Sequence, residues 1–148
     1  MSHIYNLKEK KFLIYGLGLT GQSVIKYFKK KRILDYYLWD DKKEIRKKFK
    51  IKNNLPIKKI LEEVDYIVLS PGINPRKKRN KNLSIFSNKV ISDIDLLYMT
   101  NLKFTSIVIT GTNGKSTTGK IITHLLKKNS FKVFFGGNIG KPILNFKL

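Results

Sequence analysis

The sequence contains no cysteine and no alanine, and acidic residues and arginines are few. Without cysteine the chain can form neither disulfide bonds nor thiolate metal sites, which suits a reducing compartment. No apolar run reaches the length of a membrane-spanning helix, and residues 1–6 lack the charged and apolar regions of a signal peptide. We therefore expect a cytoplasmic chain without membrane insertion.

The shortage of acidic residues leaves a formal net charge of +21, which raises the hypothesis of a basic nucleic-acid-binding module. The positive charge is mostly lysine, whereas recognition of bases and phosphates favours the forked guanidinium group of arginine. The absence of alanine, with abundant lysine, isoleucine and asparagine, indicates A+T bias in the coding sequence. We therefore favour compositional drift as the source of the charge and expect no nucleic-acid partner. A basic nucleic-acid-binding module remains an alternative.

A first glycine loop follows a short apolar run. Residues 11–15 form the run, Gly16-Leu-Gly-Leu-Thr-Gly21 the loop, and residues 22–31 have the apolar spacing of a helix. A second apolar run at 36–39 ends in Asp40-Asp41. This order is typical of dinucleotide-binding domains, in which the acidic residue after the second strand forms a hydrogen bond with a ribose hydroxyl. A glycine turn that only allows close packing of helix and strand is the alternative.

Further elements suggest an open α/β sheet. The apolar run at 65–69 stops at Ser70-Pro-Gly-Ile-Asn-Pro75, a rigid loop at the carboxyl end of a strand, where such sheets bind ligands. A plain proline-glycine turn is the alternative. Residues 42–50 and 92–99 are predicted to be short helices, and the basic run 76–82 a solvated loop.

A second glycine loop lies between residues 107 and 118. The β-branched run Ile107–Ile109 leads into Thr110-Gly-Thr-Asn-Gly114, and a helix is predicted over 118–129. Glycines let backbone N–H groups face an anion, and a helix N-terminus adds positive potential. Lys115 would reach the outer phosphates and Ser116 would offer a hydroxyl to magnesium. A tight turn whose lysine faces water is the alternative.

The last part of the chain repeats the pattern of strand and glycine-rich loop. Residues 131–135 are predicted to be a strand that leads into Gly136-Gly-Asn-Ile-Gly-Lys-Pro142, where Asn138 would face a ligand; a plain loop is the alternative. A natural hinge at 101–104 separates two domains, 1–102 and 103–148.

Five motifs in this order resemble those of the Mur ligases of peptidoglycan synthesis. They are Gly16–Gly21, Ser70–Ile73, Asp93–Leu96, Thr110–Thr117 and Gly136–Pro142. The chain is most similar to the members that add D-glutamate to UDP-N-acetylmuramoyl-L-alanine. A member that adds L-alanine would carry histidine at Asn113. The resemblance implies an α/β fold, with a Rossmann-like parallel-sheet domain that binds the UDP-substrate, followed by the truncated start of a P-loop ATPase domain.

The resemblance also assigns site residues, with ATP and Mg²⁺ as cofactors. UDP-substrate contacts are implied for Gly18, Leu19, Thr20, Asp40, Asp41, Ser70, Pro71, Gly72 and Asn138. ATP contacts are implied for Gly111, Thr112, Asn113, Gly114, Lys115, Ser116 and Thr117, with Lys115 catalytic and Ser116 a magnesium ligand. In these ligases a hydroxyl or arginine usually follows the first acid of the uridine pocket, where this chain has Asp41 and Lys42.

The implied reaction is ATP-dependent ligation through an acyl phosphate. The substrate carboxylate attacks the γ-phosphate, and the D-glutamate amine then displaces phosphate. Complete family members are much longer and carry an acidic magnesium ligand and an amino-acid pocket beyond the region that these five motifs cover. We expect a monomeric fragment that folds its first domain but does not complete ligation. A nicotinamide-dependent oxidoreductase remains an alternative, although it leaves the second glycine loop unexplained.

Overall fold

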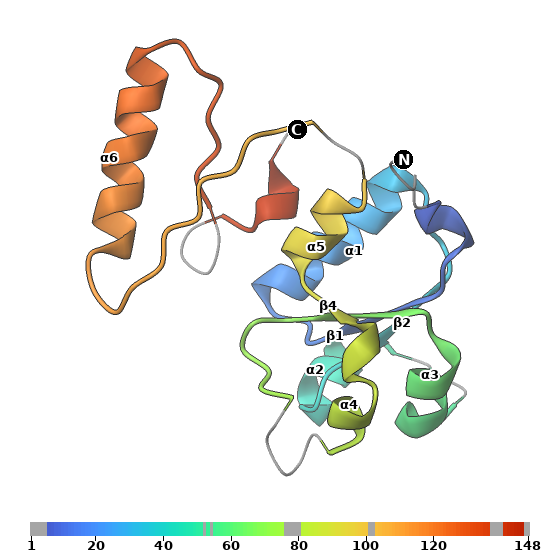
Figure 1. Ribbon diagram of the computed structural model, residues 1–148. Helices are drawn as coiled ribbons and strands as arrows, with labels where there is room; N and C mark the ends of the chain where they lie inside the picture. Colours follow the sequence, from blue (N-terminus) through green and yellow to red (C-terminus); the bar gives the residue numbers. More distant parts are fainter. Residues whose placement is uncertain are drawn as a thin grey trace. The chain divides into compact units, whose positions relative to one another are not determined.

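The computed structural model describes residues 6–51, 53, 55–75, 81–100, 103–136 and 141–146. The chain divides into two compact units, Met1–Leu102 and Lys103–Leu148, which we call unit 1 and unit 2 (Figure 1). None of the helices in these described ranges is long and apolar enough to cross a lipid bilayer.

Unit 1 is built on a parallel four-stranded sheet with the order β2-β1-β3-β4. The strands are β1 (Phe12–Tyr15), β2 (Tyr36–Trp39), β3 (Tyr66–Leu69) and β4 (Val90–Ile91). Central β1 pairs with β2 and β3, so that Phe12 lies opposite Tyr36 on one side and Tyr66 on the other. Parallel order of this kind confirms the predicted Rossmann-like α/β sheet.

Helices precede, connect and follow the strands of unit 1. The α-helices are α1 (Leu19–Lys31), α2 (Lys43–Lys48), α3 (Ile57–Glu63), α4 (Lys81–Ile85) and α5 (Asp93–Tyr98), and the 3₁₀ helices are η1 (Leu7–Glu9) and η3 (Ser87–Lys89). Ser92 caps α5: its side chain accepts the Asp95 N–H, while the Asp95 carboxylate accepts the Ser92 N–H. This reciprocal capping box explains why a helix begins there.

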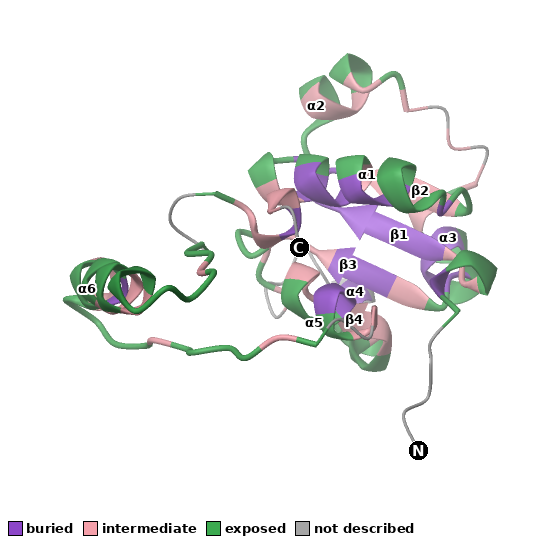
Figure 2. Cartoon of the chain, turned by 90° about the horizontal axis from the view of Figure 1, so that it is seen from above, coloured by how far each residue is buried: buried purple, intermediate pink, exposed green. Residues whose placement is uncertain are grey.

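Both faces of the sheet are covered: β1 is buried throughout, and the two middle residues of β3 are buried while its two end residues are half-buried (Figure 2). On one face, strand residues pack with side chains of α3 and α4; this cluster contains Leu13, Tyr15, Ile60, Leu61, Val64, Ile67 and Leu83. On the other face, the Phe12 ring lies 4.9 Å from the ring of Phe28 in α1, and the Phe28 ring lies 5.3 Å from that of Tyr36. Strands buried on both faces are expected to be continuous apolar runs, as these are.

Some elements differ from the sequence prediction. Helix α1 begins at Leu19 rather than residue 22, because the Gln22 N–H already donates to the Gly18 carbonyl and draws the end of the glycine loop into the first turn. The loop predicted over 76–82 is wrong at its end, since α4 starts at Lys81; residues 76–80 lie outside the described residues. Helix α3 and the two-residue β4 were not predicted.

Lys89 fastens the end of α3 to the segment before β4. Its Nζ donates to the carbonyl oxygens of Leu61, Glu62 and Val64 at 3.1, 2.8 and 2.8 Å. The last carbonyl groups of a helix lack partners within the helix, and a cation also interacts favourably with the negative end of the helix dipole. One side chain therefore satisfies the carboxyl end of α3.

Unit 2 contains α6 (Lys115–Lys128) and the 3₁₀ helix η4 (Ile143–Asn145). The predicted strand at 131–135 is wrong: within the described part of unit 2, neither these residues nor 107–109 form a strand. Both segments still lie against α6, because a Cβ added at Gly119 would be 2.4 Å from the Phe135 ring and 3.4 Å from Ile109 Cδ1. A strand needs hydrogen-bonded neighbours, which local β propensity alone does not supply.

The substitution Lys89→Met should lower the free energy of unfolding by about 1–3 kcal/mol, because backbone carbonyl groups at the end of α3 lose a charged donor. Urea unfolding followed by the fluorescence of Trp39 measures the change. The matched control is Lys58→Met, at an exposed position of α3, which should change the free energy by less than about 0.5 kcal/mol. Equal losses in the two variants would contradict this capping role.

Candidate functional site

The first glycine loop makes a backbone turn that leaves no room for side chains at two positions. Gly16 has a φ of +95°, and a Cβ there would lie 2.6 Å from Ile73 Cδ1. A Cβ at Gly21 would lie 1.9 Å from the Gly16 carbonyl oxygen. The loop thus requires glycine at its start for backbone conformation and at its end for close packing of α1 on the loop.

The loop opens directly into the N-terminus of α1. Gly18 is the N-cap residue and provides no side-chain cap for the first turn. Leu19 is 76% exposed and Thr20 is half-buried, so the helix start is accessible to a ligand. The first N–H groups of a helix have no partners within it and carry partial positive charge, which suits a phosphate group.

The carboxylate of Asp40 connects this loop to the end of β2. Asp40 is 8% exposed; its Oδ2 accepts the Leu17 N–H at 2.8 Å and its Oδ1 accepts the Lys42 N–H at 2.9 Å. Both oxygens therefore bind backbone groups of the protein. This arrangement gives Asp40 a positioning role in the loop, in addition to its predicted place near the uridine.

Asp41 points back to the central strand. Its Oδ1 accepts a hydrogen bond from the Tyr15 hydroxyl at 2.6 Å. Burial, followed by the hydrogen bond to Asp41, raises the pKa of Tyr15 above its ordinary value. The phenol therefore stays protonated at neutral pH and remains a donor to the Asp41 carboxylate.

Arg46 holds the turn between β2 and α2, a role that sequence reasoning missed. Its guanidinium carbon lies 4.5 Å from the centroid of the Trp39 ring, and its Nη1 donates to the carbonyl oxygens of Asp40 and Asp41 at 2.5 and 3.0 Å. A guanidinium stacks on indole and donates several hydrogen bonds at once. The available signal was that Arg46 is the single arginine of the helix predicted over 42–50.

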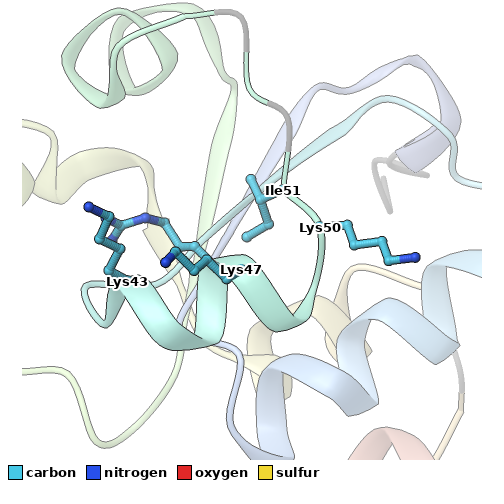
Figure 3. Close-up of a pocket in the computed structure, with 5 residues that line it drawn as sticks. Lys43, Lys47, Lys50 and Ile51 are labelled. Atoms are coloured by element: carbon cyan, nitrogen blue, oxygen red, sulfur yellow. The ribbon is translucent and has the colours of Figure 1, made fainter.

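An open hollow lies over α2 beside this turn. It is lined by Lys43, Arg46, Lys47, Lys50 and Ile51 (Figure 3). In Figure 3 the Lys43 and Lys47 side chains gather on one side of the helix, whereas Lys50 points away from them. The hollow adds positive potential near the end of β2, but its lysines lie on the surface and do not form an enclosed site.

Ser70 fastens the third strand to the same loop. Its Oγ donates to the Gly16 carbonyl at 2.8 Å, and its N–H donates to the Tyr15 carbonyl at 3.0 Å. Its own carbonyl accepts the Ile73 N–H at 3.0 Å, which closes a turn with exposed Pro71 and Gly72 at its tip. The structure therefore brings the predicted residues of three segments together at the carboxyl edge of β1, β2 and β3.

The second glycine loop, in unit 2, has the same relation to a helix. Gly111 and Gly114 have φ values of +147° and +75°, and Gly114 is the N-cap of α6 without a side-chain cap. The Lys115 Nζ donates to the carbonyl oxygens of Gly111 and Thr112, the latter at 3.0 Å. Thr112, Asn113 and Thr117 are exposed, and Asn138 lies outside the described residues.

The donor set for a metal ion is incomplete in unit 2. Ser116, half-buried in the first turn of α6, offers one hydroxyl oxygen. Residues 103–148 contain no aspartate or glutamate, and the described residues of the chain hold no cluster of three or more histidine, cysteine or acidic side chains. Magnesium is bound through carboxylates and phosphate oxygens. The loop therefore fits a phosphate chain better than it fits the metal ion itself.

Comparison with known proteins agrees with this geometry. Residues 10–92 match the family model of the MurD-like Mur ligase N-terminal domain. The chain is 40% identical over 146 residues to a UDP-N-acetylmuramoylalanine--D-glutamate ligase of Buchnera aphidicola subsp. Acyrthosiphon pisum (strain Tuc7), a match that covers 95% of this chain and 33% of the relative.

Two more relatives carry the same name. The Rickettsia prowazekii (strain Madrid E) protein is 42% identical over 149 residues, covering 95% of this chain and 32% of the relative. The Wolbachia sp. subsp. Brugia malayi (strain TRS) protein is 39% identical over 150 residues, covering 95% and 30%. The chain thus spans about a third of the length of the curated relatives it matches. By its N-terminal domain, this chain belongs to the MurD-like Mur ligases.

Proposed function

We propose that unit 1 binds the uridine diphosphate part of UDP-N-acetylmuramoyl-L-alanine, and that the chain provides the N-terminal third of a ligase that adds D-glutamate to this substrate. The observation that carries the proposal is the glycine loop at the start of α1, held between Asp40 and Ser70 at the carboxyl edge of a parallel sheet. Nucleotide phosphates bind at this edge in open α/β sheets.

The diphosphate would lie on the N-terminus of α1. The backbone N–H groups of Leu19 and Thr20 would donate to its oxygens. The space next to Gly18 is open, because a Cβ there would meet nothing within 4 Å, and the absence of a side chain would let the phosphates approach the backbone. The uridine would lie between Asp40-Asp41 and Ser70–Gly72. Asp40, Arg46 and Ser70 would keep this pocket in shape before the ligand arrives.

The second glycine loop would hold ATP through residues Gly111–Thr117, and Asn138 would face the muramoyl substrate. Lys115 would leave the loop carbonyls and donate to the transferred phosphoryl group. Ser116 would offer its hydroxyl oxygen to Mg²⁺, and the ion, when bound, would supply positive charge that offsets the charge of the phosphates.

The reaction of the complete ligase would proceed in two steps, phosphoryl transfer and then amide formation. An oxygen of the L-alanine carboxylate attacks the γ-phosphorus, the bond to the β-phosphate bridging oxygen breaks, and ADP leaves. The D-glutamate amine then attacks the acyl carbon, the C–O bond to phosphate breaks, and the amine loses a proton as the amide forms. Lys115 would stabilise charge on the phosphoryl group in the first step. The amino-acid pocket would come from the region of the relatives that this chain does not span.

Removal of one backbone donor tests the proposed binding of the diphosphate at the N-terminus of α1. Leu19→Pro removes the Leu19 N–H, while proline is tolerated at the first helical position and extended Gly18 is compatible with a following proline. We expect UDP affinity, measured by isothermal titration calorimetry, to fall about 10-fold or more, since a hydrogen bond to a charged group contributes about 1.5–3 kcal/mol.

Leu19→Ala is the matched variant, since it shortens the same exposed side chain but keeps the amide. It should lose less than about threefold in UDP affinity, with α1 retained in both variants by circular dichroism. Equal losses of UDP affinity in the two variants would contradict binding of the diphosphate through the Leu19 N–H. Binding of NADH without any binding of UDP would instead favour an oxidoreductase.

A second test concerns Asp40. Asp40→Asn places an amide NH₂ where a carboxylate oxygen accepts a backbone N–H, so one buried donor of Leu17 or Lys42 loses its acceptor. We expect the free energy of unfolding to fall by about 1–3 kcal/mol and UDP affinity to weaken. Asp35→Asn removes an exposed acid 3.9 Å from Lys11 and should change stability by less than about 0.5 kcal/mol. A stable Asp40→Asn variant that binds UDP normally would contradict the positioning role.

A further inference from the structure

Asp41 offers one carboxylate oxygen to a ligand at the carboxyl edge of the sheet. Its Oδ1 accepts the Tyr15 hydroxyl at 2.6 Å, whereas no hydrogen bond joins its Oδ2 to another of the described residues. Asp41 is exposed, but Asp40 is buried and each of its oxygens already accepts a backbone N–H. Of the two acids that follow β2, Asp41 is therefore the one with an oxygen open to a ligand.

Tyr15 determines which oxygen of Asp41 stays open. It is the last residue of β1, is only 5% exposed, and belongs to the apolar cluster between the sheet, α3 and α4, so its hydroxyl has a fixed position. A buried hydroxyl needs an acceptor for its proton, and the Asp41 carboxylate is an acceptor only. Tyr15 thus occupies Oδ1 and leaves Oδ2 for a donor on the ligand.

UDP has few groups that can donate a hydrogen bond to such an oxygen. They are the N3–H of uracil and the two ribose hydroxyls. A ribose diol would engage both oxygens of a carboxylate, but the bond from Tyr15 leaves only one. Asp40 is held to the glycine loop, where the diphosphate would lie, through the Leu17 N–H, and Asp41 is one residue further along the chain from that contact. The single N–H of the base therefore fits Asp41 better than the ribose does.

We propose that Asp41, positioned by Tyr15, accepts the N3–H of uracil and makes the site selective for uracil over cytosine. Uracil carries a hydrogen at N3, whereas cytosine has a lone pair there, which would face the carboxylate. A site built to bind a particular N–H group discriminates strongly against an analogue that lacks it. Asp41 contacts the ligand, and Tyr15 acts only through Asp41. The inference rests on the proposed function, because it takes unit 1 as the site of a uridine nucleotide.

The first measurement compares three nucleotides on the 148-residue chain by isothermal titration calorimetry. UDP should bind at least about tenfold more tightly than CDP, because CDP loses a hydrogen bond to a charged group and places a lone pair against it. UDP and dUDP should agree within about threefold, because the 2′-hydroxyl is not the partner of Asp41. This pair of ratios separates recognition of the base from recognition of the ribose.

Variants of the pair test the positioning role of Tyr15. In Asp41→Asn the Tyr15 hydroxyl needs the amide oxygen as its acceptor, so the NH₂ group faces the base; CDP should then bind at least about threefold more tightly than UDP. In the double variant Tyr15→Phe, Asp41→Asn the amide can turn either way, and the two affinities should agree within about threefold. Tyr15→Phe alone keeps the carboxylate and should retain the preference for UDP. A purely structural role of Tyr15 would not make the outcome at Asp41 depend on its hydroxyl.

Glu44→Gln is the matched control, because it removes the same charge from an exposed residue in the first turn of α2. It should leave the ratio of UDP to CDP affinity unchanged within about twofold, since any effect of the charge on the phosphates is common to both nucleotides. Circular dichroism checks that every variant keeps the fold. A second measurement follows the bound nucleotide itself: the imino proton of ¹⁵N-labelled UDP should exchange with water at least about tenfold more slowly in the complex than in free UDP.

Equal affinities of the unaltered chain for UDP and CDP, or an Asp41→Asn variant that keeps the original ratio, would overturn the inference. Weak binding of dUDP together with normal binding of CDP would assign Asp41 to the ribose and overturn it as well. A preference for CDP that persists in the double variant would refute the role of Tyr15. UDP binding without discrimination refutes this inference alone, whereas a chain that binds no UDP refutes the proposed function and this inference with it.

Discussion

The pair of hydrogen bonds from Leu17 and Lys42 to the carboxylate of Asp40 is the constraint on which the rest of unit 1 depends. A buried carboxylate is costly unless polar groups surround it, and here backbone N–H groups from two different segments do so. Because each oxygen faces one segment, neither the glycine loop nor the turn after β2 can shift without leaving the charge unsatisfied.

This constraint extends across the edge of the sheet through backbone bonds. The Gly16 N–H donates to the Trp39 carbonyl at 2.7 Å, and the Ser70 N–H donates to the Tyr15 carbonyl at 3.0 Å, one residue beyond the paired strands in each case. The ladder of the sheet thus continues into the loops that carry the candidate site. Loops held in this way are suited to binding, because little ordering is left for the ligand to impose.

The sequence was sufficient for elements whose signal is local. The three apolar runs that became β1, β2 and β3 and the helix capped by Ser92 could be predicted because propensity, pattern and capping agree. The roles of Arg46 and Lys89 could not, since their partners are set by tertiary packing. The strand predicted at 131–135 failed because pairing is a property of neighbours rather than of the segment.

The close contacts at glycine have a consequence for how this sequence can drift. Alanine codons begin with GC and glycine codons with GG, so mutational pressure toward A and T disfavours both, yet this chain contains no alanine and ten glycines. At Gly16, Gly21 and Gly119 any side chain would place its Cβ within 2.6, 1.9 and 2.4 Å of a neighbouring atom. Nucleotide bias can favour lysine and asparagine on the surface. At these three positions, however, the backbone geometry excludes every residue that has a Cβ, so only a glycine codon is tolerated.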